Sequence, residues 1–203
     1  MLDSKQIYDY IIKIQSIAKI GLVCSKDEYA LTNYREINEL STKMLEDFME
    51  VKFDRPNYFQ RDIYPTPNLS TRTIITNEKN EILFVRESKD NTYSLPGGWC
   101  DLYDSPSGAA KKEVLQEAGL DVEITRLVGV FDRTPFKNDK SLPEYVIVFV
   151  GKPIDGIFHE HSYETNEVKF FPLDQLPNIS RKVSMEELKR MLDAALNNKT
   201  IFD

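Results

Sequence analysis

Cysteine and histidine are scarce in this chain, and long apolar runs are missing. The 203 residues include two cysteines, Cys24 and Cys100, and two histidines. Two cysteines do not suggest a disulfide framework, so a reducing, cytoplasmic location is expected. No apolar run is long enough to span a membrane. Residues 1–20 are amphipathic and interrupted by charges, so we expect neither a signal peptide nor a membrane partner.

Positive charge is in deficit. The chain carries 26 Lys and Arg against 33 Asp and Glu, a formal net charge of −7. A surface of this sign argues against bulk nucleic-acid binding. It remains compatible with a phosphorylated substrate, because bound divalent cations can reverse the local field.

Two amphipathic helices are expected before residue 52. In the first, apolar residues recur at three- and four-residue steps, and Gly21 is a candidate end. The second is expected over residues 27–51, with an apolar face that includes Ala30, Tyr34, Ile37, Met44 and Phe48. A helical hairpin alone has little core. We therefore expect its apolar face to pack against the rest of the chain or against a second subunit. We expect a homodimer.

The rest of the chain alternates strands with helices. After a proline-containing linker over residues 52–70, strand-like sequence occupies residues 71–76, 82–87, 93–95, 122–131, 144–151 and 168–171. Residues 77–80 read as a hairpin turn, and a helix over 185–196 begins with a capping box of Ser184 and Glu187. This order predicts an α/β fold, an α/β/α sandwich with a mixed sheet, at residues 67–203. The helical hairpin and linker occupy 1–66.

The most informative stretch is LPGGWCDLYDSPSGAAKKEVLQEAGL, residues 95–120. Ser105 is a good N-cap, Pro106 suits the first helical position, and Gly119 suits a left-handed C-terminal cap. Within this helix Glu113 and Glu117 are spaced so that both carboxylates project from one face. Paired oxygen ligands of this kind suit Mg²⁺, together with waters and substrate phosphate oxygens.

The same stretch resembles the Nudix box, G-x5-E-x7-R-E-U-x-E-E-x-G-U, where U is aliphatic. Gly98 stands at the first glycine, Glu113 and Glu117 at two of the glutamates, and the spacing matches throughout. Three identities differ: the sequence has Asp104 for Glu, Lys112 for Arg and Gln116 for Glu. The resemblance implies the Nudix fold, and Mg²⁺ or Mn²⁺ as cofactor.

The resemblance also implies site roles. Glu113 and Glu117 would bind the metal with the carbonyl of Gly97, and Lys112 would orient the metal-binding glutamate and pair with Asp104. A further carboxylate, as metal ligand or general base, is expected from the loop before a late strand. Glu164 is the candidate there, with Glu160 and Glu167 in reserve. For the substrate, the guanidinium groups of Arg72, Arg86 and Arg133 are candidate phosphate contacts.

The implied reaction is cleavage of a pyrophosphate bond in a nucleoside diphosphate linked to another group. Together with the N-terminal helices, the box resembles an ADP-ribose or CDP-choline pyrophosphatase subgroup, and the choice between these two substrates stays open. The three departures leave a second hypothesis, a degenerate Nudix domain that binds a nucleotide and regulates without turnover. Turnover that requires Glu117 would separate the two.

Overall fold

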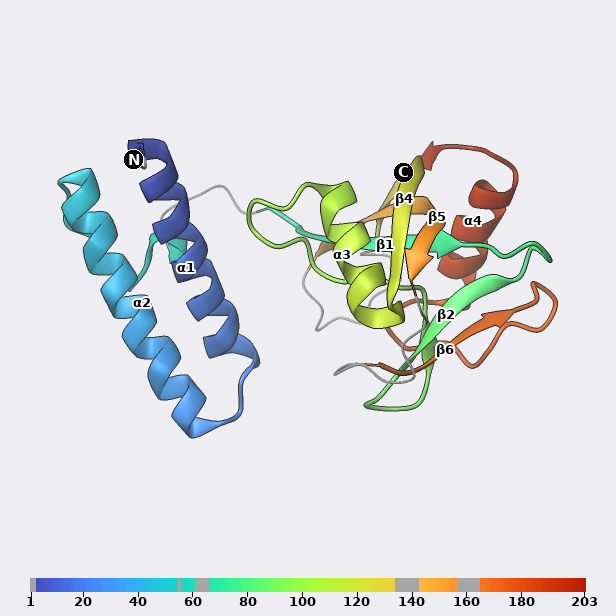
Figure 1. Cartoon of the computed structure of the whole chain (residues 1–203), viewed down its shortest axis with the longest axis horizontal. Helices are drawn as coiled ribbons and strands as arrows, with labels where there is room; N and C mark the ends of the chain where they lie inside the picture. The colour runs from blue at the N-terminus through green and yellow to red at the C-terminus, as the bar shows by residue number, and fades with distance from the viewer. Residues whose placement is uncertain (1–2, 55, 61–65, 134–142, 157–164) are drawn as a thin grey trace. The chain divides into compact units, whose positions relative to one another are not determined.

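The computed structural model describes residues 3–54, 56–60, 66–133, 143–156 and 165–203. The chain divides into two compact units, residues 1–65 and 66–203. Figure 1 shows a helical N-terminal unit and a C-terminal unit in which helices flank β-sheets. No helix in the described part of the chain is long and apolar enough to cross a membrane.

The N-terminal unit is a hairpin of α1 (Ser4–Cys24) and α2 (Glu28–Met49). Each helix begins where an aspartate accepts a hydrogen bond from a backbone amide of the first turn: Asp3 from Gln6 and Asp27 from Ala30. Gly21 was expected to end the first helix, and this expectation is wrong. The helix continues to Cys24, and a Cβ atom at Gly21 would lie 2.5 Å from the Tyr34 ring. The glycine therefore allows close contact between the two helices.

A buried amide fastens the hairpin to a short following helix, η1 (Tyr58–Gln60). The Gln15 side chain is fully buried, and its Nε2 donates to Thr42 Oγ1 at 2.7 Å. Its Oε1 accepts from the backbone N–H of Tyr58 at 2.8 Å. Gln15 thus satisfies its polar atoms internally while it ties three segments of the unit together.

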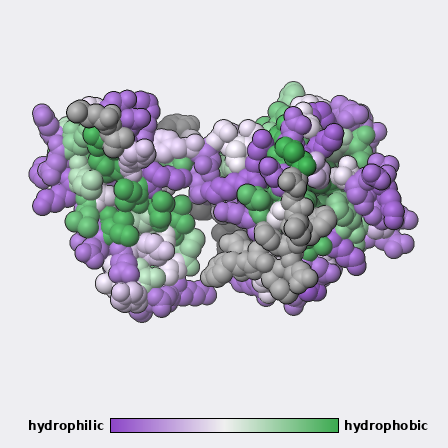
Figure 2. Space-filling view, viewed as in Figure 1, coloured by the Kyte–Doolittle hydropathy of each residue, from purple (hydrophilic) through white to green (hydrophobic). Residues whose placement is uncertain are grey.

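Apolar side chains also remain on the outside of the hairpin. Figure 2 shows them gathered on one face of the N-terminal unit. We call the following set the hairpin stripe, each member being 37–56% exposed: Ile7, Tyr10, Ile14 and Ile17 of α1, and Leu40, Met44 and Phe48 of α2. A contiguous apolar surface of this kind marks an interaction site in a soluble protein.

The C-terminal unit contains two sheets. The larger has the order β1 (Asn68–Ile75), β5 (Glu144–Gly156), β4 (Leu120–Asp132) and β7 (Ile201–Phe202). It is mixed, because β1 pairs parallel with β5 whereas β4 pairs antiparallel with β5. The smaller sheet is antiparallel, with the order β3 (Tyr93–Ser94), β2 (Ile82–Glu87) and β6 (Thr165–Phe171).

Residues 77–80 form a turn, but not the hairpin that the sequence suggested. A single antiparallel bridge, Thr76 to Ile82, joins the strands on either side. Beyond it β1 enters the larger sheet and β2 the smaller one. The hydrophobic pattern of each strand is satisfied equally well by other neighbours, so a turn signal alone does not decide strand pairing.

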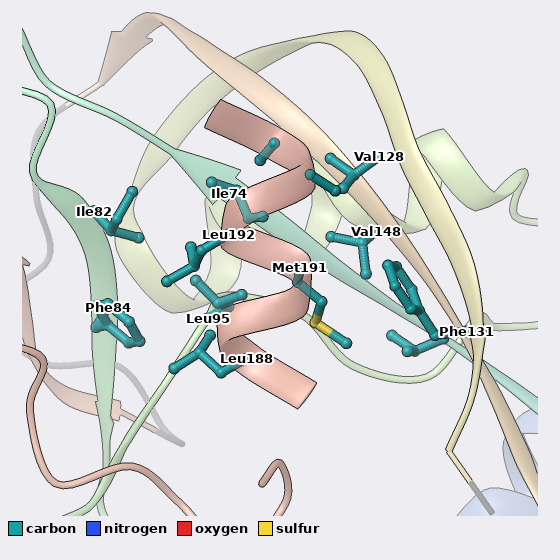
Figure 3. Packing of buried hydrophobic residues seen from close by; sticks show 13 residues of the cluster. Ile74, Ile82, Phe84, Leu95, Val128, Phe131, Val148, Leu188, Met191 and Leu192 are labelled. Atoms are coloured by element: carbon teal, nitrogen blue, oxygen red, sulfur yellow. The ribbon is translucent and has the colours of Figure 1, made fainter. Parts of the chain in front are cut away.

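Two helices, α3 (Pro106–Ala118) and α4 (Met185–Leu196), cover opposite faces of the sheets. Successive strand residues point to opposite faces. Ile74, Ile82 and Phe84 therefore pack in one cluster with Leu188, Met191 and Leu192 of α4 (Figure 3). Their neighbours Ile75, Leu83 and Val85 pack in a second cluster with Val114 and Ala118 of α3. This is the expected α/β/α sandwich.

Candidate active site

The helix α3 begins and ends where its sequence predicts. Ser105 accepts a hydrogen bond from the backbone of Gly108 at 3.1 Å, Pro106 follows as the first helical residue, and Gly119 closes the helix at φ 74°. The left-handed conformation of Gly119 is one that residues with a Cβ rarely adopt. Glu113 and Glu117 lie one turn apart between these ends, so both face the same neighbours.

A glycine turn packed against β1 provides those neighbours. The backbone amides of Thr71 and Thr73 donate to the carbonyls of Gly98 and Pro96, at 2.8 and 2.9 Å. Gly97, between them, has φ 148°, and a Cβ atom there would lie 2.1 Å from the Thr71 carbonyl oxygen. The turn can therefore approach β1 this closely only with glycine at this position.

Both glutamates reach this turn. The backbone N–H of Gly97 donates to Glu117 Oε2 at 2.8 Å. A Cβ atom built on Gly98 would lie 2.7 Å from Glu113 Oε1, so the second carboxylate lies against the adjacent glycine. The backbone amides of Thr71 and Thr73 are taken by Gly98 and Pro96, so neither of them bonds the Gly97 carbonyl.

Glu117 is the more deeply placed of the two acids. It is only 6% exposed, and burial raises the pKa of its carboxyl to about 7. The hydrogen bond from Gly97 and the charge of Arg72 lower this pKa, whereas the charges of Glu113 and Glu87 raise it. A bound cation would favour the charged form of both glutamates, and carboxylate oxygens are the ligands that hard divalent cations prefer.

Further protein ligands for a cation are not evident in the described ranges. Within residues 3–54, 56–60, 66–133, 143–156 and 165–203, no three His, Cys, Asp or Glu side chains are grouped to hold a metal ion. The candidates Glu164 and Glu160 lie outside the described residues. The other reserve, Glu167, accepts from the Tyr93 hydroxyl at 2.6 Å and pairs with Arg86 at 3.3 Å.

Lys112 is held between two aspartates of the loop that precedes α3. Its Nζ lies 2.5 Å from Asp101 and 3.0 Å from Asp104. Partial burial lowers the pKa of Lys112, but the hydrogen bonds to both carboxylates outweigh this effect and raise it. The contact with Asp104 matches the expected pair, whereas Asp101 escaped the sequence analysis. Its position in the same polar loop was the only signal available.

The three arginines predicted to contact phosphate have different surroundings in the structure. Arg72 is half-buried and donates from Nη1 to the Thr71 carbonyl at 2.7 Å, and a Cβ atom on Gly97 would lie 2.9 Å from the Cα of Arg72. Burial lowers the pKa of its guanidinium, and the nearby charge of Glu117 opposes this. Arg86 lies on β2, where its Nε donates to Asn166 at 2.7 Å. Of the three candidates, Arg72 is the one whose backbone is shown to lie against the glycine turn.

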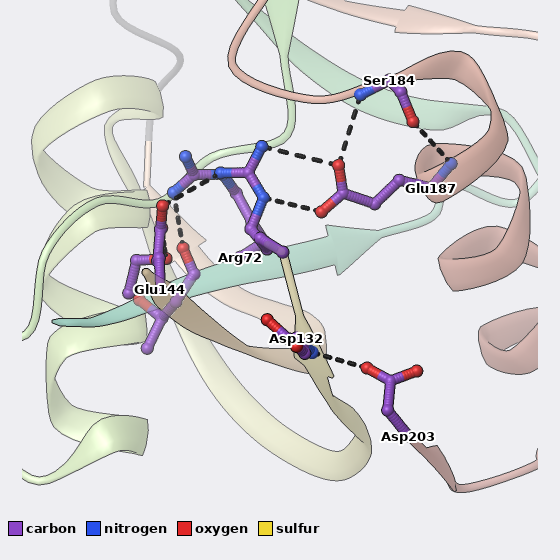
Figure 4. A network of polar contacts seen from close by, with 9 residues as sticks. Arg72, Asp132, Glu144, Ser184, Glu187 and Asp203 are labelled. Atoms are coloured by element: carbon purple, nitrogen blue, oxygen red, sulfur yellow. Dashed lines mark hydrogen bonds and ion pairs between the residues drawn. The ribbon is translucent and has the colours of Figure 1, made fainter. Parts of the chain in front are cut away.

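Arg133 lies instead in a buried ion cluster. It is 6% exposed, and its Nε donates to Glu187 Oε1 at 2.6 Å while its Nη1 lies 3.3 Å from Glu144 Oε2. Both carboxylates are buried as well. Figure 4 shows this network at the start of α4. These contacts favour a role in organising the site over direct contact with a phosphate. Sequence reasoning missed the cluster because residues 133, 144 and 187 meet only in the folded chain.

The structure places α3, which carries the residues that match the Nudix box, against the glycine turn. Comparison with known families agrees with the resemblance seen in the sequence. The sequence model of the NUDIX domain matches residues 66–193. The chain belongs to the Nudix family. A second family, described as a UDP-X-like, N-terminal oligomerisation domain, matches residues 5–55.

Relatives of this Nudix chain extend over most of its length. The Bacillus subtilis (strain 168) protein named "Putative ADP-ribose pyrophosphatase YjhB" is 36% identical over 196 residues, 94% of each chain. A crystal structure of a UDP-X diphosphatase matches with a TM-score of 0.65 and 26% identity, covering 99% of each chain. An ADP-ribose pyrophosphatase from Streptococcus suis 89-1591 matches with a TM-score of 0.59 and 37% identity, over 68% of this chain and 100% of that one.

Proposed function

We propose that this Nudix protein is a divalent-metal-dependent hydrolase that cleaves the pyrophosphate bond of a nucleoside diphosphate linked to another group. The observation that carries the proposal is the meeting of Glu113 and Glu117 at the Gly97–Gly98 turn. Glu117 is buried and Glu113 is partly buried, so their like charges repel each other with little screening by water. A cation bound between the two carboxylates would relieve this repulsion. The same turn brings the backbone of Gly97 and Gly98 against both carboxylates, because glycine has no Cβ atom to hold its neighbours away.

Mg²⁺ or Mn²⁺ is the proposed cofactor, with Glu113, Glu117 and the Gly97 carbonyl as its protein ligands. When bound, such an ion would screen the phosphate charges and lower the pKa of an attacking water. Two or three protein ligands suffice for Mg²⁺, since it keeps several waters and binds substrate phosphates directly. Glu164, outside the described residues, stays the candidate for an additional ligand or general base.

The remaining residues would position the substrate. Lys112 holds the loop of Asp101 and Asp104 against the first turns of α3, and this fixes the helix that carries Glu113. Arg72, beside the glycine turn, is the proposed contact for a diphosphate oxygen, because a guanidinium presents paired donors to phosphate. Arg86, already paired with Glu167, is a second candidate on β2.

The names of the relatives support a choice of substrate class. Two of the relatives above bear ADP-ribose pyrophosphatase names, and the UDP-X diphosphatase shares both units of the chain. We propose a nucleoside diphosphate joined to a sugar or small alcohol, with ADP-ribose and CDP-choline as the first compounds to test. UDP-linked compounds belong in the same screen.

We further propose that the chain is a homodimer joined through the hairpin stripe. The stripe is exposed on the N-terminal unit, and residues 5–55 match a family described by its oligomerisation. A two-fold axis would let the same apolar side chains cover one another, as in most soluble homodimers.

The test is a screen of nucleoside diphosphate derivatives with Mg²⁺ and with Mn²⁺, followed by Glu117→Gln. Turnover should be nearly abolished in this variant while the fold is kept. The matched control is Glu123→Gln, an exposed glutamate on β4, which should retain activity. Saturable nucleotide binding without product in the wild-type protein would instead favour the regulatory hypothesis. Turnover that survives Glu117→Gln would contradict the proposed site.

A further inference from the structure

The buried cluster around Arg133 joins three elements near Arg72. Arg133 directly follows β4, Glu144 begins β5, and Glu187 lies in the first turn of α4. The guanidinium bonds both carboxylates, with Nε 2.6 Å from Glu187 Oε1 and Nη1 3.3 Å from Glu144 Oε2. Glu187 is also stabilised by the capping box with Ser184. Glu144 lies at the start of a strand, and Arg133 provides it with a buried ion pair.

The other oxygen of Glu144 points to the strand that carries Arg72. Ser70 Oγ donates a hydrogen bond to Glu144 Oε1. Ser70 and Arg72 are two residues apart on β1, so their side chains leave the same face of the sheet. The Glu144 carboxylate therefore lies on the Arg72 side of the sheet, as the close-up of the network in Figure 4 illustrates.

Arg72 thus lies in the field of carboxylates on two sides. The charges of Glu117 and Glu144 both act on its guanidinium, and Arg133 acts with the opposite sign. A guanidinium pairs readily with a carboxylate, in the same geometry that suits a phosphate. Without the opposing charge of Arg133, Glu144 would attract Arg72 more strongly and compete with a substrate phosphate for it.

We propose that Arg133 is a positioning residue that neutralises Glu144 and thereby keeps the Arg72 guanidinium available for an anionic diphosphate. This rests on the proposed function, in which Arg72 contacts the diphosphate. Arg133 itself, 6% exposed and bonded to two carboxylates, does not touch the substrate. The competing explanation is that Arg133 only fastens β4 and β5 to α4, and removal of one partner from a buried ion pair does destabilise a protein.

A double-mutant cycle separates the two explanations. Steady-state kinetics are measured with Mg²⁺ and the best diphosphate substrate for the wild type, Arg72→Ala, Arg133→Met and the double variant. We expect Arg133→Met to raise KM roughly tenfold and to change kcat by less than about threefold. In the Arg72→Ala background the same substitution should leave KM unchanged. Equal increases in KM in both backgrounds would show that Arg133 acts only through the fold.

A second variant removes the proposed competitor. Glu144→Gln can still accept from Arg133 through its amide oxygen and can donate to Ser70 Oγ through its amide nitrogen, but it carries no charge to attract Arg72. Added to Arg133→Met, it should bring KM back to within about threefold of the wild-type value. Alone, it should leave KM unchanged or lower. A rise in KM for Glu144→Gln alone would overturn the proposal, and this test does not require Arg133→Met to fold.

Failure of this inference can be told apart from failure of the proposed function. Wild-type protein that hydrolyses no diphosphate in the screen would contradict the proposed function. Wild-type turnover combined with an unchanged KM for Arg72→Ala would leave that function intact and refute the role of the Arg133 cluster alone. Circular dichroism at the assay temperature confirms that each variant compared is folded.

Discussion

The backbone N–H of Gly97 donates a 2.8 Å hydrogen bond to Glu117 Oε2, across 20 residues of sequence. This bond connects the turn that packs on β1 with the far end of α3. It also holds a desolvated carboxylate against the backbone of a residue whose missing side chain lets the turn pack on β1. The chemistry proposed for the chain depends on this contact more than on any other.

Replacement of Gly97 by alanine should damage the fold itself. The φ of 148° is unfavourable for any residue with a Cβ, and the new atom would lie 2.1 Å from the Thr71 carbonyl oxygen. Because the obstacle is backbone, β1 or the turn must shift, and we expect a loss of at least about 1–3 kcal/mol of stability. Urea unfolding followed by circular dichroism measures this loss, and a Gly97→Ala protein as stable as the wild type would contradict it.

The adjacent substitution, Gly98→Ala, should act on the site and spare the fold. Its Cβ would meet the Glu113 carboxylate at 2.7 Å, and a glutamate side chain can move where backbone cannot. We expect weaker Mg²⁺ binding, by on the order of tenfold, with a small change in stability. Calorimetric titration with Mg²⁺ and thermal unfolding, carried out on the same sample, test the two parts. Unchanged Mg²⁺ affinity would argue that Glu113 is not a ligand.

The pKa of Glu117 predicts how the stability of the metal-free protein depends on pH. The folded value is about 7, above the ordinary 4.5, so the folded state keeps a proton that the unfolded state releases. The contribution of Glu117 to the free energy of unfolding is therefore fully present below pH 4.5 and is lost as the pH rises through 7. Relative to Glu117→Gln, the wild type should lose on the order of 3 kcal/mol across this window.

The measurement is urea unfolding of both proteins at several pH values in a chelating buffer. The difference between wild type and Glu117→Gln should grow from acid toward neutral pH. Added Mg²⁺ should reduce it at neutral pH, because a cation stabilises the charged carboxylate. A difference that stays constant with pH would mean that Glu117 is not desolvated in the folded chain.

Lys112 and Lys111 form a matched pair on α3. Lys112 contacts Asp101 and Asp104, whereas Lys111 is exposed. Lys112→Met should lower turnover about tenfold, because the loop that orients the start of α3 loses its anchor. The loss of stability should stay near 1 kcal/mol or less, since these ion pairs are partly solvated. Lys111→Met should retain both properties, and equal effects of the two variants would remove Lys112 from the site.

The hairpin stripe predicts the oligomeric state. Ile14 and Met44, 44% and 49% exposed, belong to the stripe on different helices. Ile14→Glu combined with Met44→Glu would place two charges in each half of a dimer interface, so the protein should become monomeric. Light scattering at micromolar concentration measures this. Arg35→Glu, an exposed polar position on α2, is the control that should leave the dimer intact. A monomeric wild-type protein would contradict the proposal.

Local signals in the sequence predicted the elements well. The strand over 82–87 and the helix over 185–196 match in both bounds, and α3 follows its N-cap, Pro106 and Gly119. Expectations failed where a residue type has two physical uses. Gly21 could end a helix or admit a neighbouring ring, and only the packing of Tyr34 decides between them. Likewise, the turn at 77–80 does not determine the sheet that each flanking strand joins.

The sequence by itself determined the helix that presents Glu113 and Glu117 and the glycine turn that precedes it, because caps, spacing and φ preferences act over a few residues. Only the tertiary structure decided that Glu117 loses its solvent, that Lys112 gains Asp101, and that Arg133 is committed to Glu144 and Glu187. Burial and charge pairing depend on segments that lie far apart along the chain, and their meeting is set by how the strands pair and how the helices pack on them.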